Sequence, residues 1–247
     1  SLNLKPKYPF DFGAFPLNVS MTLENITSMQ PFFLRSDNAL IIKMSVNGLE
    51  INTANVYTIV SYSYFMFNGL HLKCLDVVMN NLNINISQLV NFISTENYDV
   101  FQSTKSGYQV EAEKSYYSLT VSNLFIGNYL GGFLFLDSIL SAGPTKYQII
   151  FNNFTLDTFN GYLLQTRESV DMNITNMSVT NINIIDRTGA SPLIDIISNS
   201  SVNIENVVLM DSFIGDIGWM TIDSTPVNIK NLTLVNSDSN IQIKNSI

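Results

Sequence analysis

The phrase VNIENVVL occupies residues 202–209, and similar eight-residue phrases stand on either side of it. MNITNMSV occupies 172–179, and VNIKNLTL occupies 227–234. In all three phrases apolar side chains stand at positions 1, 3, 6 and 8, and Asn stands at position 5. We call this pattern the octet. Self-similarity that recurs every few tens of residues indicates stacked structural repeats.

Further octets extend the repeat toward the N-terminus. Asn holds position 5 in those that begin at residues 21, 93, 119 and 149, whereas Gly holds it in those that begin at 44 and 65. Because Asn and Gly share a tolerance for the left-handed backbone, position 5 is predicted to be a corner with positive φ. The predicted corners are Asn25, Gly48, Gly69, Asn97, Asn123, Asn153, Asn176, Asn206 and Asn231.

These corners follow one another at uneven intervals, which suits coils whose loops differ in length. The phrase VMNNLNI near Asn81 also resembles the octet, but it comes so soon after Gly69 that no full coil fits between them. Asn81 is therefore not predicted to be a corner. A third apolar run follows most octets, as in FLFLD at 133–137 and WMTID at 219–223.

Strand, corner, strand, loop and third strand give an all-β fold with little helix, because runs rich in Ile, Val, Phe and Thr favour strands. The repeat resembles the right-handed parallel β-helix of pectin-lyase-like proteins over residues 17–247, with about nine coils of three strands each. The resemblance implies an inward ladder of hydrogen-bonded Asn side chains at the corner. Residues 1–16, rich in Pro and aromatics, are predicted to form a separate cap or docking segment.

The composition excludes several classes of protein. Of the 247 residues, 46% are hydrophobic and 13% are charged, which argues against a disordered chain. The net charge of −8 argues against a nucleic-acid partner, because phosphate binding needs a basic surface. No run of about 18 apolar residues predicts a membrane span.

The sequence shows no catalytic, cofactor or metal signature. The hydrolases that share the resembled fold carry paired aspartates and a Gly-His-Gly segment, and neither occurs here. The single histidine, His71, stands at an outward position. Asp137, Asp195 and Asp223 do not stand at equivalent positions, so no calcium column is predicted. A carbohydrate-active enzyme, lyase or hydrolase, stays open as the alternative function.

Eight Asn-x-Ser/Thr sequons indicate a glycoprotein of the secretory pathway. Four of them fall on predicted corners and are expected to point inward, out of reach: Asn25, Asn153, Asn176 and Asn231. The expected glycosylation sites are Asn18, Asn85, Asn173 and Asn199.

The leading hypothesis is therefore an extracellular or cell-surface, non-catalytic structural or adhesive rod that carries N-glycans. A β-helix exposes strand edges at both tips, and such edges template further pairing. The expected partners are a second copy stacked head to tail, which builds a filament, or further parts of a longer chain.

Overall fold

The structure of the chain is a computed structural model. The structure describes residues 10–11, 17–28, 34–36, 39–53, 63–67, 74–86, 89–96, 116–128, 130–137, 146–159, 162–166, 170–182, 192–197, 201–213, 218–223, 226–238 and 241–244. Within these residues the chain forms strands and turns, and no helix is present.

The longer strands form one parallel sheet of eight, in the order β16-β14-β12-β10-β8-β6-β4-β2. Each of these strands pairs with the strand two places along the chain, so the sheet grows by one strand per coil. The bounds are β2 Leu17–Ser28, β4 Ala39–Thr53, β6 Cys74–Ile86, β8 Tyr116–Gly127, β10 Lys146–Asp157, β12 Val170–Thr180, β14 Ser201–Met210 and β16 Val227–Val235.

The shorter strands form a second sheet of nine, which runs in the order β1-β3-β5-β7-β9-β11-β13-β15-β17 and is also parallel. The bounds are β1 Phe10–Asp11, β3 Leu34–Ser36, β5 Ser63–Phe67, β7 Leu89–Glu96, β9 Leu130–Asp137, β11 Leu164–Thr166, β13 Ile194–Ile197, β15 Met220–Asp223 and β17 Ile241–Lys244.

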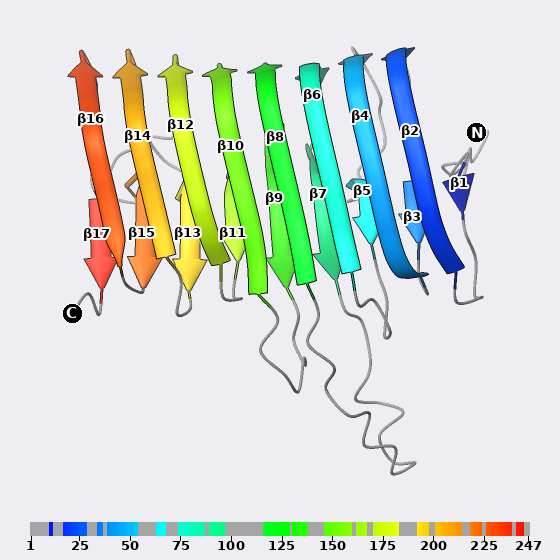
Figure 1. Cartoon of the computed structure of the whole chain (residues 1–247). Helices are drawn as coiled ribbons and strands as arrows, with labels where there is room; N and C mark the ends of the chain where they lie inside the picture. Colours follow the sequence, from blue (N-terminus) through cyan, green and yellow to red (C-terminus); the bar gives the residue numbers. More distant parts are fainter. Residues whose placement is uncertain are drawn as a thin grey trace.

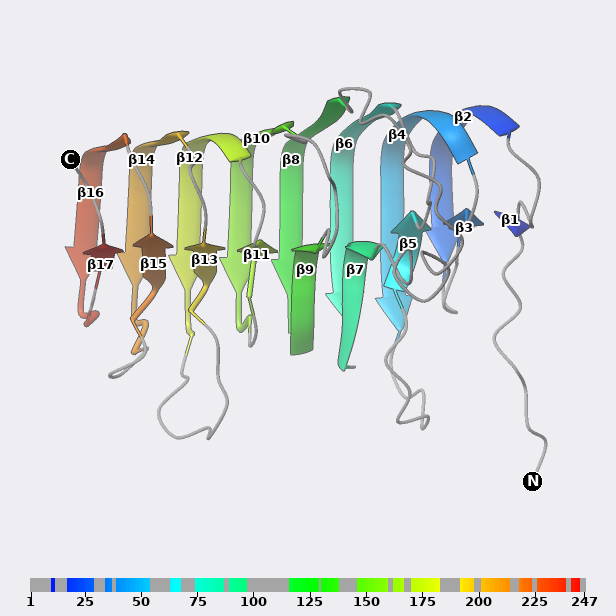
Figure 2. The same ribbon diagram turned by 90° about the horizontal axis from the view of Figure 1, so that it is seen from below.

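The two sheets lie as facing layers of one solenoid. In Figure 1 the long strands stand side by side from β2 to β16, and the short strands run in the opposite direction behind them. Figure 2 shows the two layers edge-on, with consecutive coils following one another along the long dimension of the molecule. The predicted all-β parallel β-helix is confirmed.

The octet sets the burial of the long strands. In β14, Val202, Ile204, Val207 and Leu209 are at most 2% exposed, and these residues hold octet positions 1, 3, 6 and 8. The parallel pairing keeps equivalent positions in register, so each position becomes a column that runs along the stack. Such columns turn short apolar strands into one continuous core, because no single coil can bury its own apolar face.

Leu164, Ile194 and Met220 of the short strands are 0% exposed and lie on the side of the core opposite the long strands. Their pairing joins one residue from each strand into a column that is apolar throughout: Phe10, Leu34, Phe65, Ile93, Leu134, Leu164, Ile194, Met220 and Ile241. Between the layers, Phe133 of β9 lies edge-on to Phe151 of β10, with ring centroids 5.9 Å apart. The core therefore joins the two sheets through side-chain packing.

The third coil differs from the sequence prediction. Asn81 is a corner with φ of 55°, and its neighbours pair in register with those of Gly48 and Asn123. The run Phe65–Phe67, assigned to the octet of Gly69, lies instead in β5 of the nine-stranded sheet, and Ile93–Glu96, assigned to the octet of Asn97, lies in β7. Gly69 and Asn97 themselves lie outside the described residues.

The eight-stranded sheet begins with β2 at Leu17. Within the predicted N-terminal segment, Phe10 and Asp11 form β1 and pair with Leu34 and Arg35 of β3. The described part of that segment is thus a strand of the short sheet.

Candidate functional site

The candidate site is the outer face of the eight-stranded sheet, where polar side chains recur from coil to coil. Its first element is the corner column at octet position 5. All seven asparagines in this column have φ between 52° and 62°, and Gly48 has φ of 71°. The column consists of Asn25, Gly48, Asn81, Asn123, Asn153, Asn176, Asn206 and Asn231.

The corner asparagines point outward, which corrects the expectation that they lie inside. Asn25, Asn153, Asn176 and Asn231 are all exposed. In a regular strand inward and outward side chains alternate. Octet positions 3 and 6 both point inward, so the two residues between them do not fit strict alternation. The left-handed residue inserts one extra outward position, as a bulge does, and lets both flanking halves of the strand keep their apolar side chains inside.

The corner amides bond to one another along the stack. Asn231 Nδ2 donates to Asn206 Oδ1 at 2.8 Å, and Asn206 Nδ2 donates to Asn176 Oδ1 at 3.1 Å. Asn153 Nδ2 donates to Asn123 Oδ1 at 2.9 Å. In each case the later coil donates and the earlier coil accepts, so the ladder has a direction.

Gly48 interrupts this ladder because it has no side chain. Asn81 Nδ2 donates instead to Asn47 Oδ1 at 2.9 Å, one residue before the corner. In the next coil, Asn123 Nδ2 donates to Asn80 Oδ1 at 2.8 Å and to Asn81 Oδ1 at 3.2 Å. Position 4 therefore links the coil of Asn81 to the coil of Gly48, where the corner itself offers no amide.

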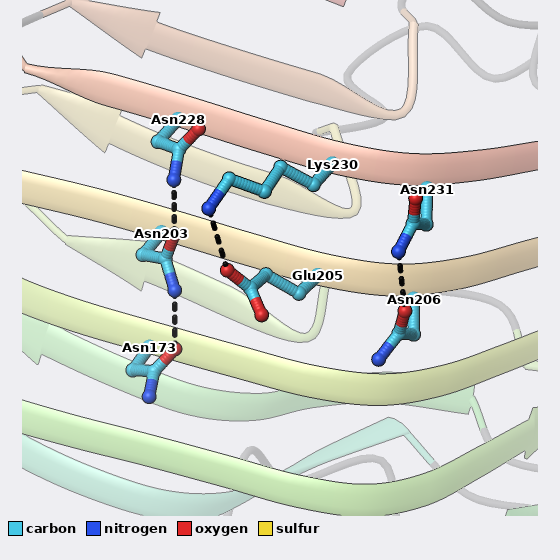
Figure 3. A network of polar contacts seen from close by, with 7 residues as sticks. All are labelled: Asn173, Asn203, Glu205, Asn206, Asn228, Lys230 and Asn231. Carbon is cyan, nitrogen blue, oxygen red and sulfur yellow. Dashed lines mark hydrogen bonds and ion pairs between the residues drawn. The ribbon is translucent and has the colours of Figure 1, made fainter.

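A second ladder runs parallel to the first at octet position 2 (Figure 3). Asn228 Nδ2 donates to Asn203 Oδ1 at 2.6 Å, and Asn203 Nδ2 donates to Asn173 Oδ1 at 2.9 Å. Between the two ladders, Lys230 Nζ lies 3.2 Å from Glu205 Oε1. Figure 3 shows that these seven side chains form cross-strand contacts over three consecutive long strands.

A second left-handed corner, which was not predicted from the sequence, lies five residues after the first in the C-terminal coils. The residues with φ between 46° and 56° are Asn128, Thr158, Asn181, Asp211 and Asn236. Asn181 Nδ2 donates to Asp157 Oδ1 at 2.9 Å, and Asn236 Nδ2 donates to Asp211 Oδ1 at 2.7 Å. The signal was present in the sequence, since four of these five positions carry Asn or Asp, the side chains that tolerate this backbone.

The residue after the second corner turns back into the core. Phe159, Ile182 and Ser212 occupy this position in successive coils, and each is fully buried. Ser212 Oγ donates to the Met210 carbonyl at 2.8 Å and accepts from the Ile182 N–H at 3.2 Å. The buried hydroxyl is thus satisfied from two sides.

The expected glycosylation sites lie in different environments. Asn18 is exposed on β2, whereas Asn85 and Asn173 are half-buried on the outer face. Asn173 Oδ1 is occupied by the Asn203 amide. Asn199 and the histidine at position 71 lie outside the described residues.

The chemistry of this face is amide hydrogen bonding. Within the described ranges, no group of three or more His, Cys, Asp or Glu side chains could hold a metal ion. Asp195 and Asp223 pair with Thr221 and Ile197, so the two carboxylates are two residues out of register. The same described ranges contain no helix that is long and apolar enough to cross a membrane.

No family model matches the chain, and no curated protein or solved structure shows significant similarity to it.

Proposed function

We propose that this protein is a non-catalytic structural or adhesive glycoprotein of the cell exterior, in which the solenoid acts as a stiff rod that presents loops and N-linked glycans. The kinship with pectin-lyase-like β-helix proteins, inferred from the octet, belongs to the same proposal. The rod hypothesis implies that the outer face has a mechanical role and does not bind a substrate.

The observation that carries the proposal is the use of the outward polar side chains. Asn206 uses its amide nitrogen and oxygen to join the coils before and after it. Asn203 does the same in the parallel ladder. Side chains held in this way lose rotational freedom and link each coil to the next, which suits a rod whose stability comes from contacts between neighbouring repeats.

The glycan component depends on which sequon asparagines can offer Nδ2 to an oligosaccharide. Asn18 is exposed, and its sequon residue Ser20 is exposed too. Asn231 is exposed as well, but its Nδ2 donates to Asn206 Oδ1. A glycan on Asn231 would displace this bond, so we expect sugar on Asn18 and none on Asn231.

Glycopeptide mass spectrometry on the protein from its natural source tests whether the protein passes through the secretory pathway and which asparagines carry glycans. Two matched variants, secreted from a eukaryotic host, refine the test. Ser20→Ala and Thr233→Ala each delete one sequon at an exposed outward position. We expect Ser20→Ala to remove one glycan mass and Thr233→Ala to remove none. Natural material without any N-glycan would exclude the glycoprotein, and sugar on Asn231 but not on Asn18 would contradict the site assignment.

A further inference from the structure

The last long strand exposes core side chains along the solenoid axis. Leu234 is 43% exposed, although Leu209 at the same octet position one coil earlier is 0% exposed. Val227, Ile229 and Leu232 are half-buried, whereas their partners in β14 are at most 2% exposed. No described strand covers β16 on this side, because β16 ends the order of the eight-stranded sheet.

The first long strand has the complementary exposure at the other end of the sheet. Met21, Leu23 and Ile26 of β2 are half-buried, whereas Met44, Val46 and Leu49, their partners in β4, are at most 3% exposed. Both free edges carry the octet, at 21–28 and at 227–234. If β16 of one copy lay beside β2 of a second copy with the octets in register, Ile229 would face Leu23 and Leu232 would face Ile26. The apolar columns would then continue from one copy into the next.

The charges on the two edges are complementary at octet position 4. Lys230 is 59% exposed and already contacts Glu205, its partner one coil earlier. Glu24 holds position 4 in β2 and is exposed. If β16 paired in register with β2 of a second copy, the Lys230 ammonium would lie between Glu205 of its own chain and Glu24 of the second copy. This contact between the two copies, called the joint below, would repeat the contact between Lys230 and Glu205 inside one chain.

The direction of the corner ladder also matches across the joint. Inside the rod the later coil donates from Nδ2 and the earlier coil accepts at Oδ1. Asn231 in the last long strand donates to Asn206, which leaves its Oδ1 facing the free edge. Asn25 of the next copy stands at the position from which its Nδ2 would donate to this oxygen. The ladder would continue with unchanged polarity.

From these four matches we propose that β16 of one copy pairs with β2 of a second copy of this chain, in the register of the octet, to build an unbranched filament. This proposal identifies a second copy of the chain as the partner of the proposed rod. It rests on the proposed function only for the role of the filament outside the cell. A head-to-tail contact between two different surfaces of the same chain gives either a closed ring or an open filament, and stacking along the solenoid axis keeps successive copies in line, so it gives the filament.

The joint requires one short strand to leave its sheet, because each chain has nine short strands and only eight long ones. When β2 follows β16 directly, β17 of the first copy and β1 of the second compete for one place beside β3. Ile241 of β17 and Phe10 of β1 belong to the same apolar column. The four-residue β17 displaces the two-residue β1. Each chain then adds eight rungs, which gives an axial repeat of about 38 Å at roughly 4.8 Å per strand.

The decisive experiment compares two variants of equal charge and similar initial exposure. Leu234→Asp places a carboxylate in the proposed joint, whereas Val78→Asp places one on the outer face of β6, where Val78 is 44% exposed. We expect Leu234→Asp to weaken self-association at least a hundredfold in sedimentation velocity, since the charge would lose its water in the joint. Val78→Asp should stay within about threefold of the unmodified chain, because an exposed site outside the joint contributes little.

A charge exchange tests the register. In a Glu205→Gln background, which removes the internal partner of Lys230, Lys230→Glu alone and Glu24→Lys alone should each weaken association roughly tenfold. The two changes in one chain should restore association to within about threefold, because every joint again has one charge of each sign. Circular dichroism of each variant verifies that the coils are folded.

Electron microscopy of the unmodified chain should show filaments with the axial repeat given above. The proposal is overturned by a monomer at all concentrations, by equal weakening in Leu234→Asp and Val78→Asp, or by failure of the charge exchange to restore association. A longer natural chain whose own additional coil covers β16 would also overturn it. Filaments formed by a protein without glycans would leave this joint intact and remove only the glycoprotein hypothesis.

Discussion

Asn231 lies one coil beyond Asn206 at the same corner, and its Nδ2 donates a hydrogen bond of 2.8 Å to Asn206 Oδ1. Both residues are exposed and have φ of 54° and 58° respectively. The residue at this corner therefore has to meet two requirements. It must tolerate the left-handed backbone, and its side chain must both donate and accept a hydrogen bond. Asn meets both requirements, whereas Gly meets only the first.

Replacing Asn206 separates these two contributions. Asn206→Gly keeps the backbone and removes two ladder bonds, so we expect a loss of roughly 1–2 kcal/mol in the free energy of unfolding. Asn206→Val removes the same bonds and also forces a β-branched residue into the left-handed region, which adds about 1–2 kcal/mol. Urea denaturation measures both variants.

Thr175→Ala serves as the control, because Thr175 also bonds across coils at 2.8 Å, to Asn152, but lies outside the left-handed corner. It should cost about 1 kcal/mol. Equal stability of Asn206→Gly and Asn206→Val would show that the corner does not require a left-handed backbone at this position.

Ser212 gives a second prediction, which concerns the stability lost when a buried polar group loses its hydrogen-bond partner. Its hydroxyl accepts from the Ile182 N–H at 3.2 Å, and the residue is 0% exposed. Ser212→Ala leaves that N–H without this partner inside the core, so we expect a loss of about 1–3 kcal/mol.

Ser237→Ala is the matched control for Ser212, since Ser237 Oγ makes the equivalent bonds one coil later. It donates to the Val235 carbonyl at 2.9 Å and accepts from the Ser212 N–H at 3.0 Å. Ser237 is only half-buried, and water can replace part of its bonding. Thermal denaturation should rank Ser212→Ala as clearly less stable than Ser237→Ala, and the reverse order would contradict the burial argument.

The inward face of the long strands could be predicted from the sequence because it depends on local alternation. Octet positions 1, 3, 6 and 8 read directly as core, and the structure buries Ile204 and its equivalents. The outward direction of position 5 was predicted wrongly, because the resemblance supplied an inward ladder. The phase of the octet itself, with apolar side chains at 3 and 6, already contained the correct answer.

The coil that contains Asn81 could not be predicted because strand pairing is nonlocal. The intervals from Gly48 to Asn81 and from Asn81 to Asn123 are both longer than any interval between consecutive predicted corners. Two short strands, β5 and β7, resemble octets closely enough to fill these long intervals when the sequence is read in one dimension. Only the register of β4, β6 and β8 resolves which phrase belongs to which sheet.

Gly48 gives a third prediction, on the one glycine in the corner column. Its φ is 71°, and a Cβ placed on it would lie 2.8 Å from Asn25 Oδ1. Gly48→Ala should therefore destabilise the protein by about 1–2 kcal/mol through backbone strain, with the contact adding to it. Gly48→Asn carries the same Cβ but tolerates this backbone and brings an amide to the ladder, so its cost should be smaller. Equilibrium denaturation compares the pair, and equal destabilisation would indicate that the contact with Asn25, and not φ, limits this position.

Phe151 tests the coupling between the two sheets. The residue is fully buried in β10, edge-on to Phe133 of the short sheet and 5.6 Å from the Phe154 ring. Phe151→Ala should cost about 3–5 kcal/mol, the usual range for deleting a buried aromatic side chain. Phe125→Ala is the control in the adjacent strand β8, because Phe125 is 40% exposed and should cost less than about 1 kcal/mol.

The location of Phe151 also predicts how the protein unfolds. Stability in a stack of coils is a sum of coil terms and neighbour terms, so a defect in the middle weakens the link between the two halves. We expect Phe151→Ala to lower the steepness of the urea transition and to increase amide hydrogen exchange first in β8, β10 and β12, while β4 keeps its protection. A uniform increase over all long strands, with an unchanged slope, would show instead that the solenoid unfolds as one cooperative unit.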